Sequence, residues 1–136
     1  VYYTVPLRSS KPFIGVIYYV TVEEGYRGRG IGSALVLSAE EGANASAYMA
    51  TTRRGNTASL RLFESLGYRA AELDKMSREA GSLLDKALCS YEDDVLLYKG
   101  VEGVEELTSA LKMFRSDVET FHREACYNPW QRLRKA

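Results

Sequence analysis

The sequence predicts an α/β domain in which strands and helices alternate along the chain. Two apolar runs rich in Val, Ile and Tyr, at residues 2–7 and 13–22, have the composition of strands. A glycine-rich turn at residues 27–32 then leads into a run with helical periodicity, and a further strand and helix follow. The chain has 136 residues, which is enough for one domain with its own hydrophobic core.

The first half of the chain contains two strand-and-helix units. Residues 8–12 are turn-like, so the two N-terminal runs are expected to form a β-hairpin. The helix that follows the glycines is expected to stop near Gly42. A short strand is expected at residues 47–52, and Asn56 then caps a second helix, which Gly67 ends.

The second half adds two strands and two amphipathic helices. Residues 68–71 and 94–99 have strand character. Apolar residues at intervals of three and four predict a helix at residues 73–89, and a longer stripe predicts another at residues 104–126. Asn128-Pro129 is expected to end the last helix. Such stripes usually pack on their own domain, and a dimer or partner interface is the alternative.

The glycine-rich turn RGRGIG, residues 27–32, is the most informative segment. Its three glycines allow successive N–H groups at the helix N-terminus to point at one anion. Arg27 and Arg29 add charged donors. The turn is not a Walker loop, since no Gly-Lys-Ser or Gly-Lys-Thr follows, and its spacing does not fit the dinucleotide pattern G-x-G-x-x-G. The segment predicts a phosphate cradle, with an ordinary tight turn as the alternative.

Two motifs in this order resemble those of one family. The pattern R-x-x-G-x-G at residues 27–32 resembles the acetyl-CoA signature of the GCN5-related N-acetyltransferase (GNAT) family. The segment from Asn56 to Tyr68 resembles the helix motif N-x-x-A-x-x-L-Y-x-x-x-G-F of the same family. The resemblance covers residues 1–99, and the rest of the chain lies outside it.

The resemblance implies a GNAT-type fold, which is a mixed, mostly antiparallel sheet with splayed central parallel strands and flanking helices. Acetyl-CoA would lie with its pantetheine in the gap between those strands. Residues 20–22 would run beside the pantetheine and the acetyl group, residues 28–33 would hold the pyrophosphate, and Asn56 would meet the cofactor from the second helix. The implied cofactor-binding residues are Val20, Thr21, Val22, Arg27, Gly28, Arg29, Gly30, Ile31, Gly32, Ser33, Asn56 and Phe63.

The resemblance also implies acetyl transfer to a primary amine by direct attack in a ternary complex. The chain departs from the family at the usual catalytic positions, because the general acid is replaced by Phe63 and the general base by Thr51. Tyr18 is the best candidate for a proton donor, although a packed aromatic is the alternative reading. The N–H region of Val22 is placed to polarise the thioester carbonyl. Further candidates to face the acceptor are Glu23, Glu24, Tyr91, Glu92 and Asp93, although exposed loop acids are usually only solvated.

Composition restricts the partners. The 18 Lys and Arg residues equal the 18 Asp and Glu residues, so no net charge draws the chain to nucleic acid or to an anionic membrane. Cys89 and Cys126 are too few for a disulfide framework, and no signal-like or membrane-spanning run is visible, so a reducing cytoplasm is the default location. No metal site is predicted, and His122 is expected to be structural.

Residues 1–99 are expected to form the acetyl-CoA-binding core, with a helical insertion at residues 73–89, and residues 100–136 to add an amphipathic helix and a tail. Relatives carry further elements before the hairpin, so the resemblance implies that the N-terminal part of the fold is missing or shortened. The acceptor is a small-molecule or peptide amine that the sequence does not identify. Two alternatives stay open: a catalytically silent CoA-binding or regulatory module, and an interaction module that forms a homodimer through its helices.

Overall fold

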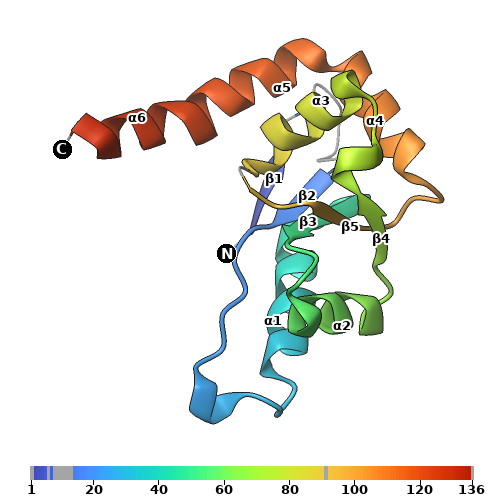
Figure 1. Ribbon diagram of the computed structural model, residues 1–136, viewed down its shortest axis with the longest axis vertical. Coiled ribbons are helices and arrows are strands. Elements are labelled where there is room, and N and C mark those ends of the chain that lie inside the picture. Colours follow the sequence, from blue (N-terminus) through green and yellow to red (C-terminus); the bar gives the residue numbers. More distant parts are fainter. Residues whose placement is uncertain (1, 6, 8–13, 91, 136) are drawn as a thin grey trace.

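The computed structural model describes residues 2–5, 7, 14–90 and 92–135. It contains a five-stranded mixed sheet with helices on both faces (Figure 1), in the strand order β1-β2-β3-β5-β4. The strands are β1 (Tyr2–Val5), β2 (Ile14–Ile17), β3 (Ala47–Thr52), β4 (Arg69–Glu72) and β5 (Val95–Lys99). β1 and β2 pair antiparallel as the two arms of the predicted hairpin, whose turn-like residues 8–12 lie outside the described residues.

The only parallel pair among the described strands is β2 with β3, and it is short. Its register runs from Ile14 opposite Ala47 to Val16 opposite Met49. β3 continues to Thr52 because β5 pairs with its other edge. The prediction that β2 extends to Val22 is wrong, since the backbone leaves the sheet after Ile17. The sheet therefore splays between two central parallel strands, as the GNAT-type fold requires.

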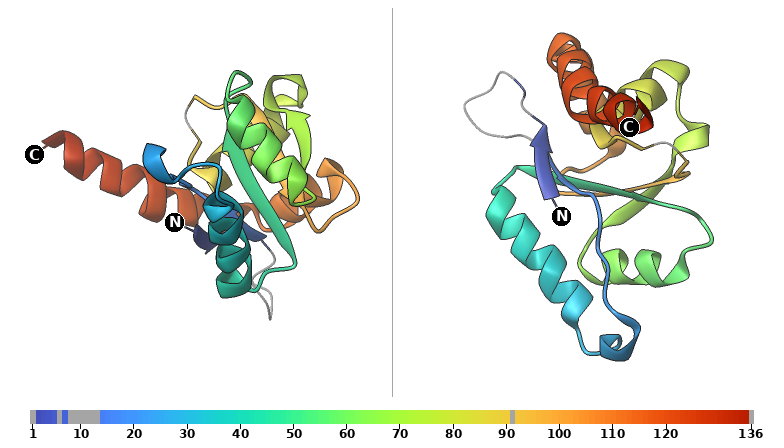
Figure 2. Two further views of the ribbon diagram at one scale, coloured as in Figure 1. Left: turned by 90° about the horizontal axis from the view of Figure 1, so that it is seen from below. Right: turned by 90° about the vertical axis from the view of Figure 1, so that its left-hand side faces the viewer.

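Alternation along the strands divides the core between the two faces of the sheet. Ile14 and Val16 of β2 face one cluster, and Ile17 faces the other. The first cluster is covered by α3 (Arg78–Leu88), α4 (Val104–Met113) and α5 (Arg115–Phe121). The second is covered by α1 (Ile31–Ala43) and α2 (Thr57–Ser65), which lie together on the opposite side in Figures 1 and 2.

The predicted helix boundaries are right in the first half of the chain to within a residue or two. α1 ends one residue beyond Gly42 and is capped by Asn44 in a left-handed conformation, with φ 48°. Asn56 caps α2, and Gly67 follows it with φ 89°. The predicted helix at residues 73–89 is wrong in its first turn, where a 3₁₀ turn precedes a new N-cap at Ser77.

The prediction that Asn128-Pro129 ends the last helix is also wrong. A π-helical segment, His122–Tyr127, follows α5, and α6 (Asn128–Lys135) continues from it away from the sheet (Figure 1). Within that segment the N–H of Asn128 donates to the carbonyl of Arg123, five residues back. Proline lacks an N–H and crowds the carbonyl four residues before it. The wider turn allows the helix to continue in spite of this.

No helix in the described part of the chain is long and apolar enough to cross a membrane.

The two cysteines form a disulfide bond between the end of α3 and the π-helical segment. Cys89 and Cys126 are both buried. Two cysteines are too few to predict a framework of several disulfides, and the sequence does not predict this single disulfide either. Its cysteines are 37 positions apart in sequence and are brought together by helix packing.

A polar cluster around Glu40 joins α1 to β3, to β5 and to Tyr68, which precedes β4. The hydroxyl of Tyr68 donates to Glu40 Oε1 at 2.8 Å, and Lys99 Nζ lies 3.0 Å from the same oxygen. The hydroxyl of Tyr48 donates to the Glu40 carbonyl at 2.7 Å. Burial, followed by the hydrogen bond and the negative charge of Glu40, raises the pKa of the Tyr68 phenol well above its ordinary value.

We expect Tyr68→Phe to lower the free energy of unfolding by about 1 kcal/mol at neutral pH, because one buried hydrogen bond is lost. A phenol whose pKa is raised by folding stabilises the native state below its unfolded pKa of about 10, and this stabilisation is lost as pH rises above that value. Urea unfolding at pH 7 and above pH 10 should therefore show a smaller alkaline loss for the variant than for the wild type. Tyr127→Phe, at an exposed tyrosine, is the control. An unchanged alkaline loss in Tyr68→Phe would contradict the assignment.

Candidate functional site

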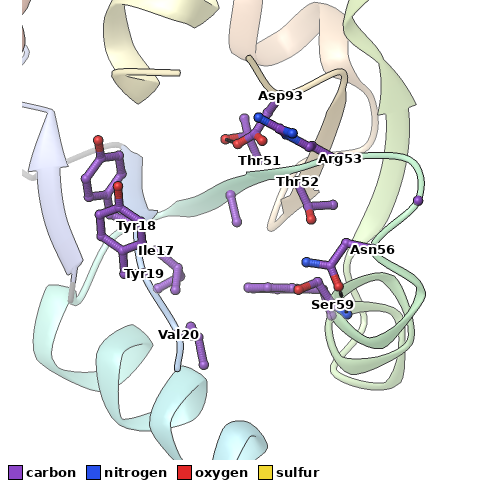
Figure 3. A pocket seen from close by; sticks show the side chains of 13 residues that line it. Ile17, Tyr18, Tyr19, Val20, Thr51, Thr52, Arg53, Asn56, Ser59 and Asp93 are labelled. Carbon is purple, nitrogen blue, oxygen red and sulfur yellow. Dashed lines mark hydrogen bonds between the residues drawn. The ribbon is translucent and has the colours of Figure 1, made fainter. Parts of the chain in front are cut away.

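A pocket of about 530 Å³ occupies the splay between β2 and β3 (Figure 3). One wall is formed by residues 17–20, where the chain leaves β2, and the other by residues 50–53 at the end of β3. α2 contributes Ser59 and Phe63, and Asp93 reaches the pocket from the connection that precedes β5. The pocket thus exists because the two parallel strands stop pairing at Val16 and Met49.

A groove of about 490 Å³ leads from this pocket to the N-terminus of α1. It follows residues 20–22, passes the glycine-rich turn and is closed on its other side by α2. Val20, Asn56 and Ser59 line both cavities, so the groove and the pocket form one elongated site.

The glycine-rich turn presents backbone N–H groups at the end of the groove. Gly28 and Gly30 both have φ 77°, a left-handed conformation that favours glycine. Gly30 is the N-cap of α1 and offers no side chain to bond the N–H groups of the first turn. That turn contains no acidic residue, so its partial positive charge is not offset locally. The arrangement suits an anion.

The two arginines of the turn have different places. Arg27 lines the groove, and its Nε donates to the carbonyl of Val22 at 2.9 Å, which ties the turn to the chain leaving β2. Arg29 does not line the groove, and its guanidinium lies 5.5 Å from the ring centroid of Tyr26. Of the two, Arg27 is thus the arginine placed to reach a ligand.

The remaining predicted cofactor contacts fall on the same elongated site. Phe63 is buried and lies in the pocket rather than the groove, with its ring edge-to-face against Tyr68. No hydrogen bond among the described residues engages the N–H of Val22. The predicted contacts that line the groove are Val20, Thr21, Val22, Arg27, Gly28, Gly30, Ile31, Gly32, Ser33 and Asn56.

The pocket contains a hydrogen-bonded pair that the motifs did not identify. Thr51, at the family's usual base position, donates from Oγ1 to Asp93 Oδ2 at 2.7 Å. Asp93 is one of the five loop residues that the sequence offers as candidates to face the acceptor, and nothing in the sequence favours it over the other four. The antiparallel register of β3 with β5, which pairs Thr52 with Val95, is the signal that brings it beside Thr51.

None of the other described members of this set lines the pocket, although Glu92 lines a smaller cavity beside it. Glu23 and Glu24 are exposed near the 3₁₀ turn Glu24–Tyr26 and line neither cavity. Glu92 is exposed and forms an ion pair with Arg53. Tyr91 lies outside the described residues.

Two tyrosines face this pair across the pocket (Figure 3). Tyr18 lies one residue beyond β2, and its ring is edge-to-face with that of Tyr19 at 4.4 Å between centroids. The pocket therefore brings phenol hydroxyls and a carboxylate to its two walls.

In the described part of the chain no group of three His, Cys, Asp or Glu side chains is arranged to hold a metal.

The splayed parallel pair and the glycine-capped helix define an α/β domain with one elongated site, suited at one end to an anion and lined by titratable groups at the other. The model of the acetyltransferase (GNAT) family matches residues 2–68, from β1 to the residue before β4. Over these residues the chain is similar to the GNAT family. No curated protein matches the chain.

We expect Asn56→Ala to lower the free energy of unfolding by about 1 kcal/mol, because the Asn56 side chain accepts a hydrogen bond from the N–H of Ser59 at 3.1 Å and so caps α2. Asn56→Asp keeps a capping oxygen and should retain wild-type stability in urea unfolding. Equal losses in both variants would contradict the capping role.

Proposed function

We propose that the chain binds acetyl-CoA along the elongated site and transfers the acetyl group to a primary amine in a ternary complex. The observation that supports this most is the continuity of an anion-binding helix N-terminus with a pocket that contains a carboxylate and phenols. The match to the acetyltransferase (GNAT) family supports the reaction class, and the shape and lining of the site support this orientation of the ligand.

The chain's residues fit such a ligand. The N–H groups of residues 28–33 would bond the pyrophosphate, and the open space at Gly30 is where a Cβ would intrude on it. Residues 20–22 leave the sheet with no partner strand, so their backbone can pair with the amides of pantetheine. The thioester would then lie at the pocket in the splay.

Acyl transfer requires proton movements at two atoms. The acceptor ammonium loses a proton, and its nitrogen bonds to the thioester carbon. The C–S bond then breaks to release a thiolate, which takes up a proton, while the nitrogen gives up its second proton and so replaces the one that the donor supplies. Asp93, held by the Thr51 hydroxyl, accepts the first proton directly or through one water. The Tyr18 hydroxyl supplies the second, because Phe63 cannot donate one. The N–H of Val22 stabilises the growing charge on the carbonyl oxygen.

The lining of the pocket also favours a cationic amine as the acceptor. Asp93 carries a negative charge at its wall, and Tyr18 and Tyr19 present aromatic surface that attracts a cation. The nearby arginines do not create an acidic-substrate site, because Arg53 pairs with Glu92, and Arg54 lies 3.1 Å from the carboxylate of Glu72.

A catalytically silent CoA-binding module is the second candidate. It is favoured by one observation: Phe63, where relatives carry the proton-donating tyrosine, is buried against Tyr68 as a packing residue. Such a module would bind CoA and acetyl-CoA and would show no turnover with any amine.

The loop assignment predicts that Gly30→Leu abolishes CoA binding in calorimetric titration, because the new side chain enters the pyrophosphate site. The variant also places a side chain on left-handed backbone, which costs about 1–2 kcal/mol of stability. Gly67→Ala imposes the same kind of strain outside the groove, at φ 89°, and should bind CoA normally. Wild-type affinity in folded Gly30→Leu would remove the assignment.

The base assignment predicts that Asp93→Asn lowers kcat by about 10²- to 10⁴-fold and leaves the Kd for CoA unchanged. Glu24→Gln, at an exposed acid that lines neither the pocket nor the groove, should keep wild-type turnover and serves as the control. Normal kcat in Asp93→Asn would exclude this residue as the base.

A further inference from the structure

We infer that the C-terminal helices, which lie outside residues 2–68, position both walls of the acceptor pocket through Phe121 and the Cys89–Cys126 disulfide. The predicted effect on turnover rests on the proposed function, whereas the predicted effect on the structure of the pocket walls rests on packing alone. Phe121 ends α5 and Cys126 lies in the π-helical segment that follows, so one stretch of chain makes both connections.

The first connection is a chain of aromatic contacts. The ring of Phe121 stacks on that of Tyr3 at 5.4 Å between centroids, and Tyr3 meets Tyr18 edge-to-face at 5.8 Å. Tyr3 is itself fixed by its hydroxyl, which donates to the carbonyl of Ala87 at 3.0 Å. Tyr18 lies one residue beyond the end of β2. Packing from α5 reaches its ring through Tyr3 and so contributes to where its hydroxyl lies.

The second connection is covalent and reaches the opposite wall. A smaller cavity of about 310 Å³ adjoins the pocket and shares Tyr18, Tyr19, Thr51 and Asp93 with it. Cys89 lines this cavity, and the disulfide joins it to the π-helical segment. The bridge is therefore part of the wall that carries the proposed base.

The bridge fixes one end of the connection from α3 to β5. Cys89 caps α3 with φ 49°, a conformation that glycine or asparagine adopts more readily, so the residue is held where its local preference is weak. The other end is fixed independently by Asp94. Its side-chain Oδ1 accepts from the N–H of Arg54 at 2.6 Å, and its backbone N–H donates to the carbonyl of Thr52 at 3.3 Å. With both ends fixed, Asp93 stays within reach of Thr51.

A control is needed to distinguish positioning of the pocket walls from general stabilisation of the packing between α3 and α5. Lys86 Nζ and Glu119 Oε1, 2.7 Å apart, also join α3 to α5, but neither residue lines the pocket or its smaller neighbour. Lys86→Met removes this tie and keeps the apolar stem. If the disulfide and Phe121 position the pocket walls, their loss alters the pocket, whereas loss of the ion pair in Lys86→Met does not.

The test compares the oxidised protein, the protein reduced by dithiothreitol, Phe121→Leu and Lys86→Met. Reduction adds two electrons and two protons to the disulfide, gives two thiols and converts the dithiol to its own disulfide. Phe121→Leu keeps an apolar side chain so that the helix still packs. Each form is assayed for the KM of a polyamine acceptor, for kcat against pH, for the Kd of CoA and for amide hydrogen exchange.

We expect reduction and Phe121→Leu to lower kcat/KM for the amine by about ten- to a hundredfold, with the CoA Kd unchanged. Exchange should rise several-fold at residues 18–20 in Phe121→Leu and at residues 92–94 after reduction, and Lys86→Met should change neither quantity. Unaltered exchange at both walls, or an equal effect in Lys86→Met, would overturn the inference. Altered exchange in a protein that binds no CoA or shows no turnover would instead refute the proposed function and leave the positioning role standing.

Discussion

The end of pairing between β2 and β3 is the constraint on which the site depends. β3 continues past Met49 because β5 holds its other edge, whereas the chain leaving β2 turns away toward the glycine-rich turn. This divergence opens the pocket and leaves residues 20–22 outside the strands that the structure describes. An extended ligand can then use backbone groups that a continuous sheet would have occupied. The pocket and the backbone that borders the groove both result from this divergence of the two strands.

Electrostatics assign opposite roles to the two ends of the site. The N-terminus of α1 is positive because Gly30 gives it no capping side chain and its first turn contains no acid. The pocket end contains the Asp93 carboxylate and two phenols. A thioester attached to a phosphorylated carrier fits this polarity, with the phosphates at the helix and the reacting carbon near a proton acceptor. The helices beyond the family-matched residues contribute to the second end, through Phe121 and the disulfide, and not to the first.

Local sequence signals predicted the parts of the fold that local physics determines. Asn56 and Gly67 identified the ends of α2, because capping and positive φ depend on single residues. The glycine-rich turn identified the groove for the same reason. The end of β2 at Ile17 could not be read, since Val20 and Val22 suit a strand and only the missing partner on β3 excludes one.

The features that sequence missed are those that tertiary contacts create. Asp93 depends on the register of β3 with β5, and the bridge between Cys89 and Cys126 depends on the packing of the π-helical segment against α3. Pro129 predicted a helix end because proline disrupts the interior of an α-helix, yet the wider turn just before it allows the helix to continue. Each case combines a correct local preference with an outcome set elsewhere in the chain.

The central claim is that the groove and the splay pocket together hold acetyl-CoA. Calorimetric titration of the purified, oxidised chain with acetyl-CoA at moderate salt tests it most directly. Saturable one-to-one binding, abolished in Gly30→Leu and retained in Gly67→Ala, is the predicted result. A folded chain that shows no saturable binding would contradict the claim, because the elongated site would then have no ligand of the proposed kind.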